Sequence, residues 1–293
     1  PPMSRKYFVD TCLRIVEWFD VDGFRFDLMG ILDYNLMNEI AEKCRALKPD
    51  FMIYGEGWNM PSFVPEHLRA SMLNQAHMPL IGHFSDRFRE TCRGSNGDLE
   101  ICGYSNGDTG LLNSMQQCLG GGCLDHLFDS PQKAINYVEC HDNHTLWDKN
   151  SVCCQHESRG VLMQRQTLAN ALVILAQGIP FLHAGQEFGR TKYNLGNSYN
   201  RSDHYNHIDY NLRNKHMPIV VDTKLLIKIR KEHPCFRLAT KEEIEANVSF
   251  GDIDGKVLVY QAKCKEDVCL CFFNPTSEHF TYDSHQKLSI LFD

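Results

Sequence analysis

The stretch from residue 21 to residue 30, VDGFRFDLMG, decides how the chain is expected to fold. Within it, apolar residues alternate with Arg25 and Asp27, and a period of two is typical of a β-strand whose two faces meet different surroundings. A charged pair on one face of a short strand is unusual. The end of this strand is therefore a place where we expect chemistry.

Apolar residues recur at helical or strand spacing on both sides of this stretch. They predict helices over residues 4–19, 35–47, 158–177 and 223–232, and strands over residues 51–54, 135–139 and 179–183. Short buried strands that alternate with helices are typical of a parallel sheet, because parallel strands need a helix-sized crossover. We therefore expect an α/β fold.

Two regions depart from this alternation. Residues 92–125 are rich in Gly, Asn and Asp, and we expect them to form a long surface loop of the kind that carries substrate contacts in α/β enzymes. After about residue 240, the pattern predicts strands over residues 246–250, 257–261 and 268–273. We therefore expect an α/β domain over residues 1–240 and the start of a small antiparallel β domain over residues 241–293.

The composition limits the function. Thirty basic and 37 acidic residues give a net charge of −7, and no basic stripe is interleaved with aromatic residues, so no nucleic-acid partner is expected. No apolar run reaches the roughly 18–20 residues of a membrane span, so no membrane partner is expected. Thirteen cysteines without C-x-x-C pairs favour reduced thiols, and hence a cytoplasmic location, over disulfides or a zinc site. The first Met is third in the chain, so no targeting signal can be read there.

Three acidic residues each follow a predicted strand. They are Asp27, Glu56 in the stretch YGEGW and Asp142 in the stretch YVECHDN. The carboxyl ends of parallel strands gather at one edge of a sheet, where α/β proteins place their active sites. We therefore expect the three carboxylates to converge.

Converging carboxylates suit the hydrolysis of a glycosidic bond. Two carboxyl groups about 5 Å apart allow one to attack the anomeric carbon while the other protonates the leaving oxygen, and a third can stabilise the positive charge on the sugar ring. We expect Arg25 to keep Asp27 ionised. Negative or apolar neighbours such as Trp58 should keep Glu56 protonated, and Trp58 and His141 are suited to contact a sugar.

Several stretches together resemble the type I pullulanase subgroup of the alpha-amylase superfamily. VDGFRFDLMG (21–30), YGEGW (54–58) and VECHDNHTLWD (138–148) are similar to its second, third and fourth signature regions. GIPFLHAGQEF (178–188) and NSYNRSD (197–203) are also similar to that subgroup. The likeness runs in order along nearly the whole chain.

This resemblance implies the C-terminal part, strands four to eight, of a (β/α)₈ barrel, followed by a β-sandwich domain. It implies retaining hydrolysis of α-1,6 branch linkages in pullulan, amylopectin or glycogen, with Asp27 as nucleophile, Glu56 as general acid/base and Asp142 as transition-state stabiliser. The α-glucan would be contacted by further side chains of the same motifs, namely Arg25, Leu28, Met29, Trp58, His141, Asn200 and Asp203.

The resemblance also implies a missing partner segment. The nucleophile of that subgroup follows the fourth barrel strand, so we expect the first three strands, the first signature region and the Tyr-Asn-Trp-Gly-Tyr motif in an N-terminal segment of a longer parent chain. Five parallel strands alone leave two open edges and a wetted site. We therefore expect little or no activity from these 293 residues by themselves.

Two alternatives remain open. An isoamylase-like or α-1,4-acting hydrolase of the same superfamily would share the carboxylates, and a non-catalytic relative would bind a glucan without cleaving it. No cofactor is expected. Calcium is common in the superfamily, but no ligand set can be read here, because an Asp/Asn-rich loop such as residues 96–108 is a weak indicator by itself.

Overall fold

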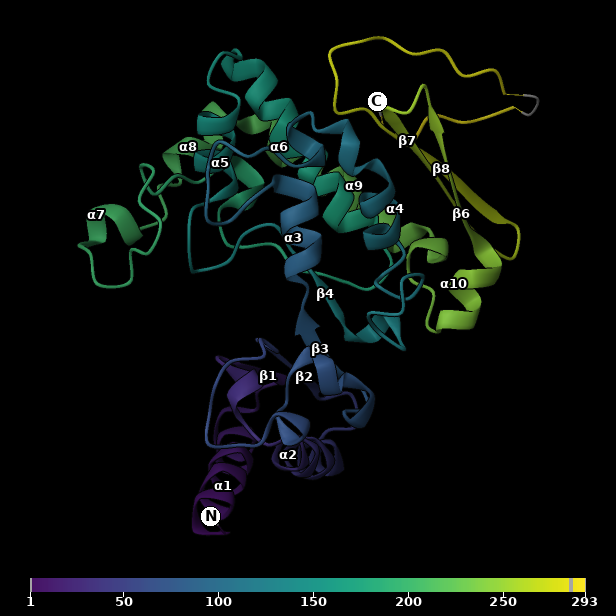
Figure 1. The fold of residues 1–293 in the computed structure, drawn as a ribbon. Coiled ribbons are helices and arrows are strands. Elements are labelled where there is room, and N and C mark those ends of the chain that lie inside the picture. The colour runs from purple at the N-terminus through teal and green to yellow at the C-terminus, as the bar shows by residue number, and fades with distance from the viewer. Residues whose placement is uncertain (1, 285–286, 293) are drawn as a thin grey trace.

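The computed structural model describes residues 2–284 and 287–292, and it contains two separate sheets (Figure 1). Five parallel strands, paired in chain order, form the first sheet and confirm the predicted α/β class. They are β1 (Gly23–Phe26), β2 (Met52–Gly55), β3 (Ile81–Phe84), β4 (Ala134–Asn136) and β5 (Ile179–Pro180). Three antiparallel strands form the second sheet, namely β6 (Val248–Ile253), β7 (Val257–Cys264) and β8 (Asp267–Phe273).

In the part of the chain that the structure describes, ten α-helices precede, connect and follow the parallel strands. They are α1 (Pro2–Phe19), α2 (Tyr34–Leu47), α3 (Asp86–Arg93), α4 (Leu112–Leu119), α5 (Leu146–Cys153), α6 (Arg159–Leu175), α7 (Asp203–Asn206), α8 (Asn211–Lys215), α9 (Met217–Glu232) and α10 (Lys241–Asn247). The four helices that the sequence predicts correspond to α1, α2, α6 and α9. None of the helices in the described residues is long and apolar enough to cross a membrane.

Local sequence sets where the helices begin. The Asp33 side chain accepts a hydrogen bond from the Asn35 backbone at the start of α2, and Ser158 accepts one from Val161 at the start of α6. Such caps satisfy backbone donors that have no partner inside the helix. Helices α1 and α2 then bury their apolar faces in a core with the early strands, so that the carboxyl ends of β1 and β2 have a rigid support.

The second sheet shares one apolar core with α4, α6 and α9. Tyr104 joins the two parts through its buried hydroxyl, which donates to the carbonyls of Lys256 and Phe273 and accepts from the Leu258 N–H. The three predicted C-terminal strands are confirmed as β6, β7 and β8. The domain boundary at residue 240 stays a prediction.

The prediction for residues 92–125 is wrong. Instead of a surface loop, this segment contains α4, and Tyr104, Met115 and Leu119 are fully buried. The segment turns inward because its apolar residues lie on one face of a short helix, which packs on the second sheet. The sequence analysis also missed β3, and it extended the strands of β4 and β5 by three residues each at their carboxyl ends.

All thirteen cysteines are free thiols, and eight of them are buried. The burial of most thiols agrees with the expectation from the sequence.

Candidate active site

The register of β1 and β2 brings two of the predicted carboxylates together. Phe26 of β1 lies opposite Gly55 of β2, so the next residue on each strand, Asp27 and Glu56, leaves the same edge of the sheet. The guanidinium of Arg25 connects them. Its Nη1 donates to Asp27, and its Nη2 donates to Glu56 Oε1 at 2.6 Å. The pair therefore has a fixed separation.

Arg25 is held in position as well. Its guanidinium lies over the ring of Phe84, 5.6 Å from the ring centroid. Burial by itself lowers the pKa of Arg25, but the hydrogen bond and charge of Asp27 and the charge of Glu56 outweigh burial and raise it above its usual value. The cation between the two carboxylates is thus permanent at any working pH.

Glu56 is buried, and its surroundings differ from those that the sequence analysis expects. Its carboxylate accepts hydrogen bonds from Arg25 and, at 2.9 Å, from the Leu28 backbone. Leu28 has a left-handed backbone with φ of 47°, which turns the chain back over the end of β2. Trp58 is close, as expected, but the nearest charge is a cation. A carboxylate oxygen of Asp27 also lies within 4.8 Å, so negative and apolar neighbours are both present, and the direct contact with Arg25 is the feature that the sequence analysis did not anticipate.

The third carboxylate reaches the first two across the sheet. Three strand spacings of about 4.8 Å each separate β1 from β4, but the loop after β4 returns toward β1. His141 connects the groups, because its Nε2 lies 3.8 Å from Asp27 Oδ1 and 3.5 Å from Asp142 Oδ1. One donor atom each of Asp27, Glu56 and His141 lies within 4.8 Å of the others. All three predicted carboxylates therefore face one small region.

Buried polar contacts fix the loop that carries His141 and Asp142. Glu139 is almost fully buried, accepts a hydrogen bond from the Leu146 N–H and contacts His183 Nδ1 at 3.0 Å. The loop also binds the segment that follows β5, because the Asn143 N–H donates to Asn197 Oδ1 at 3.1 Å. These contacts set the position of the third carboxylate relative to the strand ends.

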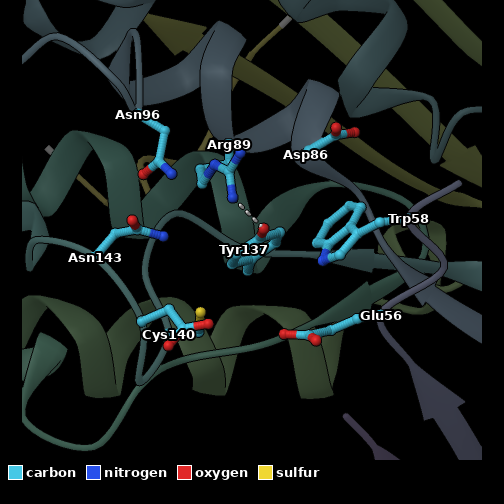
Figure 2. A pocket seen from close by; sticks show the side chains of 9 residues that line it. Glu56, Trp58, Asp86, Arg89, Asn96, Tyr137, Cys140 and Asn143 are labelled. Carbon is cyan, nitrogen blue, oxygen red and sulfur yellow. Dashed lines mark hydrogen bonds between the residues drawn. The ribbon is translucent and has the colours of Figure 1, made fainter. Parts of the chain in front are cut away.

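A pocket of about 220 Å³ opens beside the carboxylates (Figure 2). Glu56 and Trp58 form one side of it, and α3 contributes Asp86 and Arg89. The remaining lining residues come from two segments, the loop after α3 and the segment that follows β4, and they are Asn96, Tyr137, Cys140, Asp142 and Asn143. Polar groups with one large aromatic ring are suited to the hydroxyls and apolar face of a sugar.

Sequence reasoning missed the α3 side of this pocket. Arg89 Nη1 donates to the Tyr137 hydroxyl at 2.7 Å, and its guanidinium lies over the Tyr137 ring. Arg89 and Asp86 belong to α3, whose sequence is too short and too polar to predict a helix. The N-cap Ser85, whose hydroxyl accepts a hydrogen bond from Phe88 N–H, is the one signal that could have marked its start.

The remaining predicted contact residues divide into two groups. Leu28 is exposed beside Glu56, but Met29 is fully buried in the core under β1 and β2, so the prediction that Met29 lines a glucan cleft is wrong. The left-handed turn at Leu28 directs the next side chain inward. Asn200 and Asp203 are exposed around the start of α7, and no contact with the carboxylates is recorded for them among the described residues.

Solvent reaches the candidate site. The exposed fractions of the side chains are 63% for Asp27, 53% for His141 and 47% for Asp142. Strands β1 and β5 are the outer strands of the sheet in the described part of the chain. The charges at this edge are therefore screened by water unless another surface covers them.

The Asp/Asn-rich loop that could be considered as a calcium site already binds the side-chain cation of Lys149. Lys149 is buried, and its Nζ donates to the carbonyls of Ser95, Asp98, Leu99 and Ile101 at 2.6–3.1 Å. Calcium needs six to eight oxygen ligands, and these carbonyls are occupied. Residues 95–101 therefore do not fit a calcium site.

Several of the known proteins that this chain resembles over most of its length are pullulanases. No protein-family model matches the chain. The pullulanase of Bacillus subtilis (strain 168) is 37% identical over 263 residues, which cover 88% of this chain. The solved pullulanase of Anoxybacillus sp. LM18-11 is 41% identical with a TM-score of 0.86 over 89% of the chain. The pullulanase of Paenibacillus barengoltzii, solved in complex with maltohexaose and alpha-cyclodextrin, is 35% identical with a TM-score of 0.90 over 94% of the chain.

The chain matches only a part of each of these proteins. It spans 37% of the Bacillus subtilis protein and of the Anoxybacillus chain, and 44% of the Paenibacillus chain.

Proposed function

The chain is homologous to pullulanases of the alpha-amylase superfamily, and from this premise we propose that it forms the catalytic part of a glycoside hydrolase that cleaves α-1,6 branch linkages in pullulan, amylopectin or glycogen. In this proposal, β1 to β5 are strands four to eight of a (β/α)₈ barrel, and β6 to β8 begin a C-terminal β-sandwich domain. The uninterrupted parallel order of β1 to β5 supports the barrel assignment.

One observation carries the proposed mechanism: a carboxylate oxygen of Asp27 and one of Glu56 lie within 4.8 Å of each other. Retaining glycosidases hold their two carboxyl groups about 5–5.5 Å apart, whereas inverting enzymes need about 6.5–9.5 Å to admit a water molecule. Asp27 attacks the anomeric carbon, and the bond to the branch oxygen breaks as Glu56 gives that oxygen its proton. Glu56 then takes a proton from a water molecule, whose oxygen bonds to the anomeric carbon as the bond from that carbon to Asp27 breaks.

The other groups of the site stabilise charge and position the sugar. Asp142 faces the positive charge that develops on the ring, and His141, between Asp142 and Asp27, donates to a sugar hydroxyl. Arg25 orients both reacting carboxylates. Trp58 supplies an aromatic face on the side of the pocket next to Glu56.

The product of pullulan cleavage tests the linkage that is broken. Pullulan consists of maltotriose units joined by α-1,6 bonds, so cleavage at the branch bond releases maltotriose, and cleavage at an α-1,4 bond leaves products that still contain an α-1,6 bond. We expect maltotriose from the complete gene product that carries these residues, released as the α-anomer. Products with an intact α-1,6 bond would favour the α-1,4-acting alternative, and binding of pullulan without any product would favour the non-catalytic one.

Variants of the three carboxylates test the assigned roles. Asp27→Asn, Glu56→Gln and Asp142→Asn should each lower kcat by about 10³-fold or more, whereas the exposed Asp50→Asn should not. On a substrate whose leaving group needs no protonation, Glu56→Gln should regain most of the wild-type rate of the first step, in which the glycosidic bond is cleaved. Asp27→Asn should not regain it. Equal recovery in both variants would contradict the division of roles.

The exposure of the site supports a further expectation for these 293 residues alone. With Asp27, His141 and Asp142 about half or more exposed, water weakens the charge stabilisation that the reaction needs. We propose that the chain requires a covering N-terminal segment of a longer parent protein for activity. Release of maltotriose at the rate of a complete pullulanase by residues 1–293 would contradict this.

A further inference from the structure

A second group of chemically reactive side chains lies far along the chain from the carboxylates. Helix α9 ends at Glu232 with His233 as its C-cap, and a 3₁₀ turn, Pro234–Phe236, places Cys235 directly after it. Opposite them, Asp267 and Cys269 stand at the start of β8, two residues apart and hence on one face of the strand. Two short pairs, His-x-Cys and Asp-x-Cys, thus meet where α9 joins the second sheet.

The donor atoms of these pairs are close together. His233 Nδ1 lies 2.8 Å from Asp267 Oδ1, and one donor atom each of His233, Asp267 and Cys269 lies within 4.8 Å of the others. The thiol of Cys235, which is fully buried, lies against the thiol of Cys269 and the carboxylate of Asp267. The second oxygen of Asp267, Oδ2, is buried without a hydrogen-bond partner, and such an atom usually has a ligand or water to satisfy it.

We propose that His233, Cys235, Asp267 and Cys269 bind a zinc ion that connects the end of α9 to β8. One imidazole, one carboxylate and two thiols are the donors that zinc accepts in four-coordinate sites, whereas calcium and magnesium require oxygen donors. Zinc-to-ligand distances of about 2.0–2.3 Å at tetrahedral angles place the donors about 3.3–3.8 Å apart. The three closest donors therefore need to move by only about 1 Å.

The surroundings leave a path for the ion. The side chains of His233 and Asp267 are 24% and 26% exposed, so an ion can enter from that side while both sulfurs remain inside.

Another thiol group provides the main competitor for metal. One donor atom each of Cys102, Cys153 and Cys154 also lies within 4.8 Å of the others, beside the end of α5. It offers three thiols, and thiolates also bind zinc. A decisive experiment must therefore distinguish the two clusters by substitution, under reducing conditions that prevent a Cys235–Cys269 disulfide.

Cobalt substitution distinguishes them, because tetrahedral Co²⁺ bound to thiolate gives intense visible bands and a sulfur-to-metal charge-transfer band. The complete gene product, purified without metal, is titrated with Co²⁺ and then with Zn²⁺ as competitor, in parallel with His233→Gln, Cys269→Ser and Cys153→Ser variants. We expect wild type and Cys153→Ser to show the tetrahedral spectrum and to lose it when zinc is added. His233→Gln and Cys269→Ser should bind Co²⁺ with an affinity more than about 100-fold lower, because losing even a residue that only hydrogen-bonds to a ligand lowers metal affinity by about 10–100-fold.

Folding is measured separately in each variant. Circular dichroism and melting without metal show whether Cys269→Ser is folded, and the quantity compared is the rise in Tm that zinc causes, not Tm itself. His233→Gln, at a partly exposed position, tests the site even if the cysteine variant does not fold. Loss of the spectrum in Cys153→Ser but not in His233→Gln would overturn the proposal, as would the absence of any tetrahedral spectrum in wild type.

Discussion

Lowering the pH from 7 to 5 is expected to remove about 2 kcal/mol of stability through one side chain, His83. This residue lies in the middle of β3, is fully buried and stacks on Phe128 at 6.0 Å between ring centroids. Both of its ring nitrogens are buried, and neither has a hydrogen-bond partner among the described residues. Burial, with a smaller effect of the nearby Lys133 cation, lowers the pKa of His83 to about 3.

The sign and size of the effect follow from linkage. An unfolded histidine titrates near pH 6.5, so between pH 6.5 and pH 3 the unfolded chain binds a proton that the folded chain does not. The unfolded state is therefore favoured as the pH falls, by about 1.4 kcal/mol for each pH unit below 6.5. At pH 5 this amounts to about 2 kcal/mol, which corresponds to roughly 4–8 °C in Tm for a domain of about 200 residues.

The assay is urea or thermal unfolding of wild type and His83→Leu at pH 7 and at pH 5. Other groups also titrate in this range, so the informative quantity is the loss of stability in wild type minus the loss in the variant, which should be about 2 kcal/mol. His156→Leu, at an exposed position, is the control and should lose as much as wild type. If His83→Leu and wild type lose the same stability on acidification, the reasoning about His83 is refuted.

Three further predictions concern positions that set the geometry of the site and its supports. Gly30→Ala should destabilise the chain by about 1–3 kcal/mol and reduce activity, because an added Cβ would lie 1.9 Å from the facing backbone carbonyl. Gly97→Ala, with open space around it, is the control. An equal Tm for the two variants would contradict this prediction. Lys149→Met should cost about 3 kcal/mol in urea unfolding, because four backbone carbonyls lose a buried charged donor. Lys224→Met, at an exposed position, is the control and should change stability little. Arg25→Lys keeps the charge but loses the forked geometry, so kcat on pullulan should fall by about tenfold or more with little change in KM, and an unchanged kcat would argue against its orienting role.

The parts of the fold that were predictable from sequence are those whose pattern is strong over a sufficient length. Helices α1, α2, α6 and α9 have fourteen to eighteen residues, which is long enough for helical periodicity to exceed chance. Strand β3 was missed because His83 interrupts its four residues, and only burial makes that histidine acceptable in a strand. Helix α4 was missed because glycines and asparagines on both sides of it indicate a loop, although its apolar residues have helical spacing.

The candidate site was predictable for a different reason. Parallel strands bring their carboxyl ends to one edge, so Asp27 and Glu56 could be located from strand order alone. The side chain at position 29 could not be placed in that way, because its direction depends on the left-handed turn at Leu28. Arg89 and Tyr137 lie close together only after α3 and the end of β4 have packed, and no local pattern encodes that contact.

The hydroxyl of Tyr104, which serves three backbone groups of the second sheet at once, has a consequence for how the chain responds to force or proteolysis. Pulling on the C-terminal strands would have to break this three-way contact before the strands could peel from the rest of the molecule. A protease that cut the turn after β7 would leave two fragments that the β7–β8 pairing and the shared apolar core still hold together. The Tyr104 hydroxyl adds a polar contact to both fragments, so it would resist their separation beyond what strand pairing and apolar packing provide.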